Sequence, residues 1–421
     1  MKVRTLLILG IAVREAFSFW TGHPFDFEIW VRTGYWVVRG LSPYAPLPFA
    51  PGVSFANDFG NGLNPAIGYL PFWPLLLGGI YELYSGVGFG NRLAYYFLLK
   101  QPMIFADVLL AFALYVYVKR QNPDLAPKVL KLWLFSPITI IISAIWGTFD
   151  SMAMLLVMAA LLAPAGRARS AWDGLAAFVK SIPVIFVLPL SYSRENRWRN
   201  FAIALGLPVL LTAIIVYLAG WPAITQQYNV VTTLLNTLQV YGFPLSLWGT
   251  WVFLHTMNLI SDATFQGVIG WGVYLWIPAV TAASIAASRW FGSDTARGLV
   301  QSLLFTTLAF LLVRGQVNEQ YSVYLLALLL IDAALWNPKR MRLFYAVSVV
   351  VVAAIVTNNL LLIRFVSPVY PNALQVEANL ISSINELRNV LLYLEGLAFS
   401  GLNLWYLAAL IKERRPRGYE L

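Results

Sequence analysis

Apolar segments long enough to cross a lipid bilayer recur along the whole chain, from Leu6 to Ile411. Hydrophobic residues make up 59% of the sequence and charged residues 11%, against about 25% charged residues in ordinary soluble domains. Because about 20 apolar residues are needed for a helix to cross roughly 30 Å of hydrocarbon, these runs predict spanning helices. Runs such as Val347–Leu362 are continuously apolar, whereas the strands of a membrane barrel alternate. We therefore expect an all-α, polytopic membrane protein in which residues 1–421 form one integral membrane domain.

The basic residues indicate which helix ends face the cytoplasm, since Lys and Arg favour that side. Placing Lys2 and Arg4 inside puts most other basic residues inside as well. The inner clusters are residues 119–131, 167–169, 194–199, 289–297, 339–342 and 412–417. We therefore expect both termini in the cytoplasm. The formal charge of +10 then reflects topology and attraction to anionic membrane lipids, and binding to nucleic acid is the weaker interpretation.

Three apolar stretches are short or broken by proline and are expected not to span: Tyr69–Leu83, Leu175–Leu190 and Pro244–Ile260. Proline interrupts helix hydrogen bonding, and irregular backbone at membrane depth survives only where protein or a water-filled cavity covers it. We therefore expect about ten full crossings with three re-entrant or interfacial segments, which gives 10–13 hydrophobic helices in all.

Acidic residues gather on the side that this topology places outside. Asp26 and Glu28 stand near the start of a long outer loop, residues 21–96, which is expected to hold interfacial helices. A carboxylate near lipid is costly and marks a candidate functional site. The other outer acids are Asp58, Glu82, Asp150, Glu319, Glu377 and Glu386.

A second outer or re-entrant region, residues 220–260, carries amides and tyrosines that suit hydrogen bonding to sugar hydroxyls. These residues are Gln226, Gln227, Tyr228, Asn229, Asn236, Gln239 and Tyr241. Aromatic side chains also favour the membrane interface for structural reasons alone, so this region is compatible with carbohydrate without requiring it.

Four patches, in this order along the chain, resemble motifs of a known enzyme family. They are Asp26-Phe-Glu-Ile-Trp30 leading to Arg39-Gly-Leu-Ser-Pro-Tyr44, Lys100 through Asp107 to Tyr115, Trp146-Gly-Thr-Phe-Asp150-Ser151 followed by Lys180-Ser-Ile-Pro183, and Asn318-Glu-Gln-Tyr321 with Tyr324-Leu325. The chain resembles the GT-C glycosyltransferases, which are multispanning enzymes that use polyprenyl-phosphate sugars. It is most similar to the mannosyltransferase I type of glycosylphosphatidylinositol assembly and its prokaryotic relatives.

The resemblance implies a hexose donor carried on polyprenyl or dolichyl phosphate, with mannose as the favoured sugar, and a hydroxyl of a lipid or glycan as the acceptor. Two positions depart from the family pattern: Pro24 replaces the first acid of a D-x-D motif, and Thr148 replaces a glutamine. These departures weaken any metal role for the first motif. No cofactor is expected, and a divalent ion stays an open alternative; a zinc site is disfavoured because the chain has no cysteine and no paired histidines.

The chemistry of such a transfer needs a base for the acceptor hydroxyl and cations for the donor phosphate. Asp26 is the predicted base and Glu28 the runner-up. In an extended loop both could face one cavity, whereas in a helix they would diverge by about 200°, leaving one for solvent or an ion pair. A single base predicts inversion, from a β-linked donor to an α-linked product. The alternative is that Asp26 merely caps a nearby helix.

Arg314, beside Gln316 and Glu319, is the first candidate for the donor phosphate because arginine suits bidentate phosphate contacts. Lys100 and Arg364 follow, and either could instead snorkel to lipid headgroups. Asp150 is predicted either to contact the acceptor or to cap the next helix. Lys180, in a proline-broken segment, marks a functional cavity or an inner-leaflet donor path.

Asp107 is interpreted as a satisfied buried polar group, and the histidines, His23 and His255, as isolated. Two other functions stay open. A polytopic lipid or sugar transporter, or flippase, fits the broken helices but not the one-sided acids or the absence of an internal repeat. A structural membrane subunit would leave the acid-rich outer loop unexplained.

Overall fold

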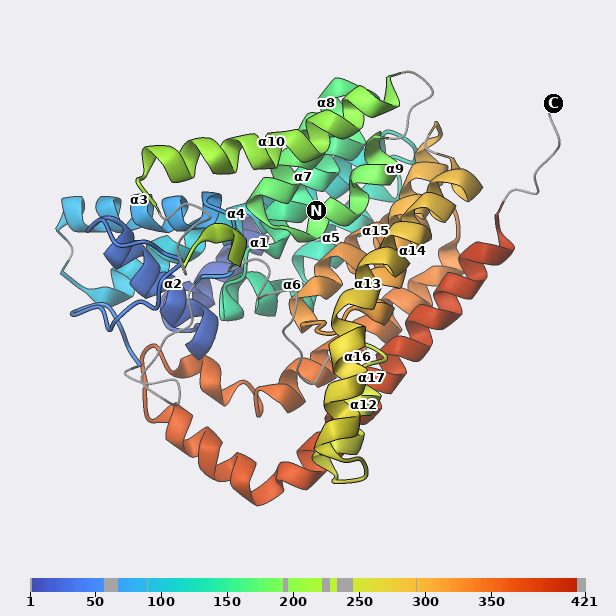
Figure 1. Cartoon of the computed structure of the whole chain (residues 1–421). Helices are drawn as coiled ribbons and strands as arrows, with labels where there is room; N and C mark the ends of the chain where they lie inside the picture. The colour runs from blue at the N-terminus through green and yellow to red at the C-terminus, as the bar shows by residue number, and fades with distance from the viewer. Residues whose placement is uncertain are drawn as a thin grey trace, which may run out of the picture.

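A computed structural model describes residues 2–56, 67–88, 90–191, 196–221, 228–232, 245–292 and 294–414 (Figure 1). The elements in these ranges are all helical, which confirms the predicted all-α, polytopic fold. They are α1 Val3–Ser18, α2 Pro24–Val37, α3 Phe72–Val87, α4 Arg92–Lys119, α5 Ala126–Leu134, α6 Pro137–Ile140, the π-helix η1 Ile141–Trp146, α7 Asp150–Leu162, α8 Arg167–Val179, η2 Ile182–Phe186, α9 Val187–Ser191, α10 Arg197–Leu218, α12 Gly249–Thr256, α13 Asp262–Phe291, α14 Ala296–Val313, η3 Glu319–Tyr321, α15 Ser322–Leu335, η4 Pro338–Arg340, α16 Met341–Asn358, η5 Ile363–Val366 and α17 Ala373–Lys412.

Local sequence explains where several helices begin. Asn91 caps α4 by accepting a hydrogen bond from the backbone N–H of Leu93, and Thr295 caps α14 through that of Gly298. Ser261 does the same for α13. Short side chains with an acceptor oxygen satisfy backbone donors that the first helical turn leaves unpaired.

Six helical segments in the described residues are long and apolar enough to span a membrane: 92–119, 197–218, 262–291, 296–313, 338–358 and 373–412. A seventh is possible if Ala126–Leu134 and Pro137–Trp146, which meet at a bend of 50°, form one span. This number is below the ten full crossings expected, because several apolar helices are short; α7, for example, has 13 residues. The chain is a multi-pass membrane protein.

The three stretches expected not to span form short or broken elements. Tyr69–Leu83 leads into α3, a helix of 16 residues that contains Pro74 in its first turn. Leu175–Leu190 is divided between the end of α8, η2 and α9. The described part of Pro244–Ile260 contains α12, which has eight residues. Asp58, Gln226, Gln227, Asn236, Gln239 and Tyr241 lie outside the described residues.

The helices form two groups joined through the middle of the molecule (Figure 1). In this view α1–α4 lie on one side and α13, α14, α16 and α17 on the other, with α8 and α10 along the upper edge. α15 is buried along nearly its whole length. α17 bends at Ile384, so that its first part crosses below the other helices and its second part packs against α14 and α16.

A buried ion pair ties together the helices of the first group. Arg14 on α1 and Asp107 on α4 are both fully buried, and the Arg14 Nε lies 2.8 Å from an oxygen of Asp107. Asp107 also accepts hydrogen bonds from Trp133, Ser143 and Ser151. Every oxygen of this carboxylate is therefore satisfied, as predicted for Asp107, and α1, α4, α5, η1 and α7 meet at one point.

We expect Arg14→Met to destabilise the protein by about 3–5 kcal/mol, because it leaves the Asp107 carboxylate buried without its cation. The double variant Arg14→Met/Asp107→Asn should recover much of that loss, because the neutral amide oxygen can still accept from Trp133 and Ser151. Thermal unfolding of purified protein in detergent measures both.

The exposed pair Arg297–Glu413 supplies the control. Arg297→Gln should change stability by less than about 1 kcal/mol, since solvent screens such pairs. Equal losses in Arg14→Met and Arg297→Gln would contradict a structural role for the buried pair.

Candidate functional site

The first acidic motif lies at the start of α2, outside the spanning helices. Pro24 occupies the first helical position, where its missing N–H costs nothing. His23 is the cap: its Nδ1 accepts a hydrogen bond from the backbone N–H of Asp26, at 3.3 Å. Asp26 therefore lies in the first turn, and the capping role considered for it belongs to His23.

The side chain of Asp26 contacts a tryptophan brought from a distant part of the chain. The indole N–H of Trp146 donates a hydrogen bond of 2.8 Å to Oδ2 of Asp26. The ring of His23 stacks on the Trp146 ring, with centroids 4.6 Å apart, and Phe365 contacts both rings. The Asp26 side chain keeps 22% exposure, so it is held on one side and open on the other.

Trp146 ends a short π-helix, a form that recurs at functional sites. Gly147 follows it at φ +83°, a left-handed conformation that favours glycine. The fully buried side chain of Lys100 holds this turn in place. Its Nζ donates hydrogen bonds to the backbone carbonyls of Thr21, of Ala144 at 2.6 Å and of Ile145 at 3.3 Å. The structure thus gives Lys100 a positioning role; its predicted phosphate contact stays a prediction.

Burial sets the charge states in the motif. It raises the pKa of the Asp26 carboxyl, an effect that the Trp146 hydrogen bond and the charge of Lys180 partly oppose and that of Asp150 reinforces. Burial, and then the charge of Arg364, hold the pKa of His23 well below its usual range, so that its ring is neutral. Asp26 is thus a carboxylate with increased basicity, hydrogen-bonded by a neutral donor.

Glu28 points away from Asp26, as the helical alternative requires. It is fully buried, lies 2.6 Å from the Arg32 Nε and accepts a hydrogen bond from the backbone N–H of Phe55. Arg32 also donates to the carbonyls of Leu47 and Ala56. The pair therefore fastens the loop after α2 to the helix, and the predicted role of Glu28 as a second base stays a prediction.

A second charged pair lies next to Asp26. Lys180 donates to Oδ2 of Asp150 at 2.7 Å, and Thr148 donates to the same oxygen at 3.0 Å. Oδ1 of Asp150 is buried and has no hydrogen-bond partner within the described residues. The Lys180 ammonium also lies over the rings of Phe149, Tyr69 and Tyr321, at 4.7–5.7 Å. Asp150 therefore does not cap α7.

The predicted phosphate ligands divide into two positions. Arg314, at the end of α14, lies over the ring of Trp276 at 4.5 Å and acts electrostatically on Tyr321, which brings it close to the Asp150–Lys180 pair. Gln316, two residues on, donates to Asn318.

Arg364 lies near His23, on which its charge acts, and its Nε is 2.6 Å from Glu377. Glu319 accepts a hydrogen bond of 2.9 Å from Asn358, and its pKa is raised, chiefly by burial, while the charge of Arg364 opposes this effect. Arg314 thus lies near Tyr321 and Arg364 near His23, and the charge of Lys180 acts on Asp26 itself.

Three residues of this arrangement escaped the sequence analysis as site components. His23 was interpreted as isolated, and Trp146 and Tyr69 were given no role. The nearest signal was the Trp146-Gly-Thr-Phe-Asp150-Ser151 motif, which places an indole and a carboxylate at one turn. Nothing in the sequence pairs that turn with Asp26, 120 residues away.

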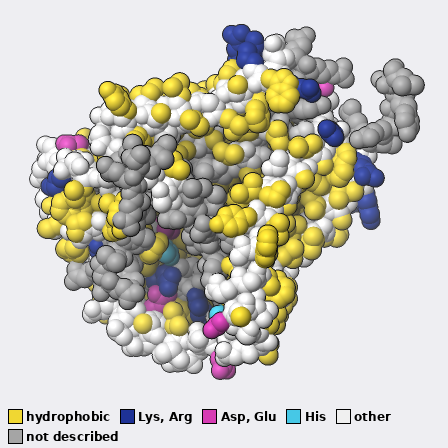
Figure 2. Space-filling view, in the orientation of Figure 1, with side chains coloured by type: hydrophobic (Ala, Val, Ile, Leu, Met, Phe, Trp, Pro, Cys, Tyr) yellow, Lys and Arg dark blue, Asp and Glu magenta, His cyan; other side chains and the backbone are white. Residues whose placement is uncertain are grey.

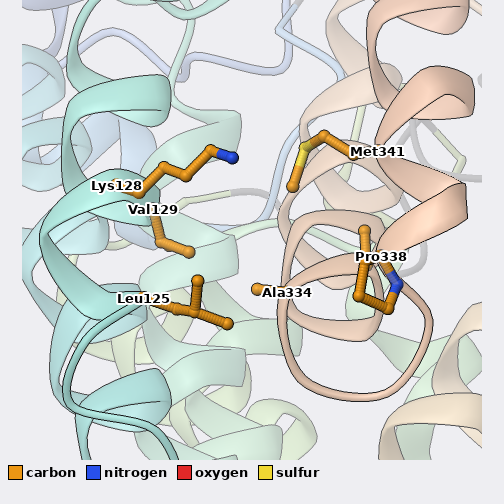
Figure 3. Close-up of a pocket in the computed structure, with 7 residues that line it drawn as sticks. Leu125, Lys128, Val129, Ala334, Pro338 and Met341 are labelled. Carbon is orange, nitrogen blue, oxygen red and sulfur yellow. The ribbon is translucent and has the colours of Figure 1, made fainter.

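Figure 2 shows acidic, basic and histidine side chains close together low on this face, whereas hydrophobic side chains cover much of its upper and right-hand parts. The pocket in Figure 3 lies elsewhere, between the start of α5 and the junction of α15 and α16, and its lining is apolar except for Lys128. Among the described residues there is no group of three His, Asp or Glu side chains that could hold a metal ion.

Stability should separate the two acids of the motif. We expect Glu28→Gln to cost about 3 kcal/mol or more, because Arg32 loses its buried counter-charge. Asp26→Asn should cost less than about 1 kcal/mol, since no cation contacts Asp26 and the amide oxygen can still accept from Trp146. Thermal unfolding in detergent compares them; equal losses would make Asp26 a structural residue.

Comparison with known proteins places the chain in a family. The family model of glycosyltransferase family 87 matches residues 63–315, about three fifths of the chain. No curated protein matches the sequence. The matched residues include Lys100, Trp146, Asp150, Lys180 and Arg314, and Asp26 precedes them. The chain belongs to glycosyltransferase family 87, and so it is a multi-pass membrane glycosyltransferase that acts on a sugar donor and an acceptor.

Proposed function

We propose that this glycosyltransferase moves a hexose, with inversion, from a polyprenyl or dolichyl phosphate to a hydroxyl of a lipid or glycan acceptor. Mannose is the sugar favoured by the resemblance to mannosyltransferase I. The proposal places the reaction at Asp26, on the extracytoplasmic side, with both termini in the cytoplasm.

The observation that carries the proposal is the state of the Asp26 carboxylate. Oδ2 is held by the Trp146 indole, whereas Oδ1 has no hydrogen-bond partner among the residues that the structure describes. The raised pKa makes this oxygen a better proton acceptor than an ordinary aspartate. A base needs an oriented, partly open oxygen of raised basicity, and Asp26 supplies it.

The reaction needs one base and no acid. As the acceptor oxygen attacks the anomeric carbon, its proton passes to Oδ1 of Asp26 and the bond from the anomeric carbon to the phosphate oxygen breaks. The phosphate leaves as a stable anion, so its departure does not need protonation. Attack from the face opposite the phosphate inverts the anomeric carbon.

Basic side chains near Asp26, Tyr321 and His23 support a phosphate leaving group. Lys180 and Arg314 lie toward Tyr321, and Arg364 lies toward His23. We propose that Arg314 and Arg364 contact the donor phosphate, since their planar forks match its oxygens. Asp150 and Lys180 would then meet hydroxyls of the sugar or the acceptor, because Oδ1 of Asp150 is buried without a partner among the described residues.

The position of the site within the fold supports the extracytoplasmic assignment. Asp26 follows the end of α1, which begins beside Lys2 and Arg4, and Arg314 ends α14, which begins next to Arg297, so both lie opposite helix ends that carry basic clusters. Basic clusters favour the cytoplasm, so the opposite ends would face outward.

Asp26→Asn should lower the transfer rate by about 10²–10⁴-fold, the usual contribution of a positioned base. The assay incubates purified protein with dolichyl-phosphate mannose, dolichyl-phosphate glucose and a membrane lipid extract, and identifies the product by mass and anomeric configuration. Asp262→Asn, at an acid whose side chain is 92% exposed, is the matched control and should transfer normally.

Two results would overturn parts of this proposal. Normal transfer by Asp26→Asn would remove Asp26 as the base. If the wild-type protein transferred nothing from polyprenyl-phosphate donors, the donor class would be wrong, and movement of unmodified lipid-linked sugar across vesicles would then favour a transporter.

The rate should also depend on pH through Asp26. The base must be ionised, so activity should fall as the pH drops through the pKa of Asp26, which lies above the ordinary value of 3.8. Trp146→Phe removes a hydrogen bond that favours the ionised form, and should move this acid limb to higher pH. Trp36→Phe removes an indole bond to Pro48 instead, and should leave the pH profile of kcat/KM unchanged. Unshifted limbs in both variants would contradict the assignment.

A further inference from the structure

A second polar cavity lies at the opposite end of the molecule, among the basic helix ends. Its volume is about 220 Å³, and it is lined by Tyr117, Arg120 and Gln121 from the end of α4, Leu161 from α7, Arg169 from α8, and Asp294, Thr295, Ala296 and Leu299 at the start of α14. None of these residues belongs to the site around Asp26.

Two arginines are anchored beside this cavity. Arg120 donates to the carbonyl of Leu162 at 3.3 Å, and Arg169 to that of Ala163 at 3.4 Å, so both are held by the end of α7. Each guanidinium has five N–H donors, and one weak bond to a carbonyl leaves most of them available. The Nε of Arg169 is buried without a hydrogen-bond partner among the described residues. A buried donor without an acceptor costs free energy unless a ligand accepts its hydrogen bond.

The opposite wall adds to the positive potential. α14 has 18 residues and begins at Ala296, so its first-turn N–H groups and the positive end of its dipole lie beside the cavity. Asp294 stands at the same wall and has an interaction of its own. The two guanidinium groups and the start of α14 contribute more positive charge than the Asp294 carboxylate contributes negative charge. The planar guanidinium groups also match the geometry of an oxyanion.

We propose that this cavity binds a phosphate group, either the headgroup of an anionic lipid or a free phosphate. The arginines contribute charged hydrogen bonds, and the start of α14 contributes backbone N–H groups. The site is separate from the reaction centre and does not depend on the function proposed for Asp26. An anion bound there would contact the ends of α4, α7, α8 and α14 at once. These helix ends lie on the side of the molecule that carries the basic clusters.

The test uses the purified full-length protein in detergent with two probes, inorganic phosphate and phosphatidylglycerol, and phosphatidylcholine as the zwitterionic reference. The readout is the ligand-induced shift in Tm, with native mass spectrometry for the retained lipid. A shift with phosphatidylglycerol alone identifies a lipid site, and a shift with inorganic phosphate identifies a free-phosphate site. Either supports the proposal. No shift with either anion, or an equal shift with phosphatidylcholine, overturns it.

Variants assign the binding to the cavity. Arg169→Gln should weaken anion affinity about tenfold or more, the equivalent of one lost charged hydrogen bond. Ala296→Glu keeps the folded state, because an acid suits the exposed first turn of a helix, yet places a negative charge in the cavity and should abolish the shift. Arg167→Gln, on the same helix as Arg169 but outside the cavity, is the control. Equal effects of Arg167→Gln and Arg169→Gln, or a normal shift in Ala296→Glu, would refute the site.

Discussion

A single buried lysine side chain joins the segments that form the candidate site. Lys100 projects from α4 and donates to backbone carbonyls at Thr21, Ala144 and Ile145, which belong to the chain after α1 and to the π-helix. A buried cation is tolerated only when its donors are satisfied, so this contact constrains three segments at once. The turn at Gly147 and the indole of Trp146 owe their position to it, and Trp146 in turn holds Asp26.

The carboxylates of the described structure divide by partner. Glu28, Asp107, Asp150 and Asp332 each contact a Lys or Arg side chain within 2.7 Å. A cationic partner favours the ionised form of an acid, although burial still leaves the pKa of Glu28 raised. Asp26 differs because its contacts are a neutral indole and a histidine kept neutral by burial. Burial raises the pKa of Asp26, and it also raises those of Glu28 and Glu319, so within the motif Asp26 is distinguished from Glu28 by having no Lys or Arg contact among the described residues.

Sequence reasoning reached the class of the protein and named residues that the structure brings together, but not the contacts that each of them makes. The fold class, the broken segments and the glycosyltransferase resemblance could be inferred from apolar runs, prolines and motif order. Asp26, Asp150, Lys180 and Arg314 were all named, and the structure brings them to one region. Glu28 and Lys100 were named with them. The sequence left open whether the segment around Glu28 is helical, and so whether Glu28 pairs with Arg32 four residues later, and it cannot show that backbone carbonyls engage Lys100.

The sequence by itself determined that the chain is helical and embedded in a membrane, because long apolar runs have no other stable state in lipid. It also determined that Asp26 and Glu28 would face different directions once the segment became helical, since side chains two positions apart diverge by about 200°. Only the tertiary structure decided which acid keeps an open oxygen. That outcome depends on Trp146 and the backbone of Phe55 approaching α2 from elsewhere in the fold, whereas the Glu28–Arg32 pair is local to the helix. Burial and long-range hydrogen bonds are properties of such tertiary contacts rather than of local sequence.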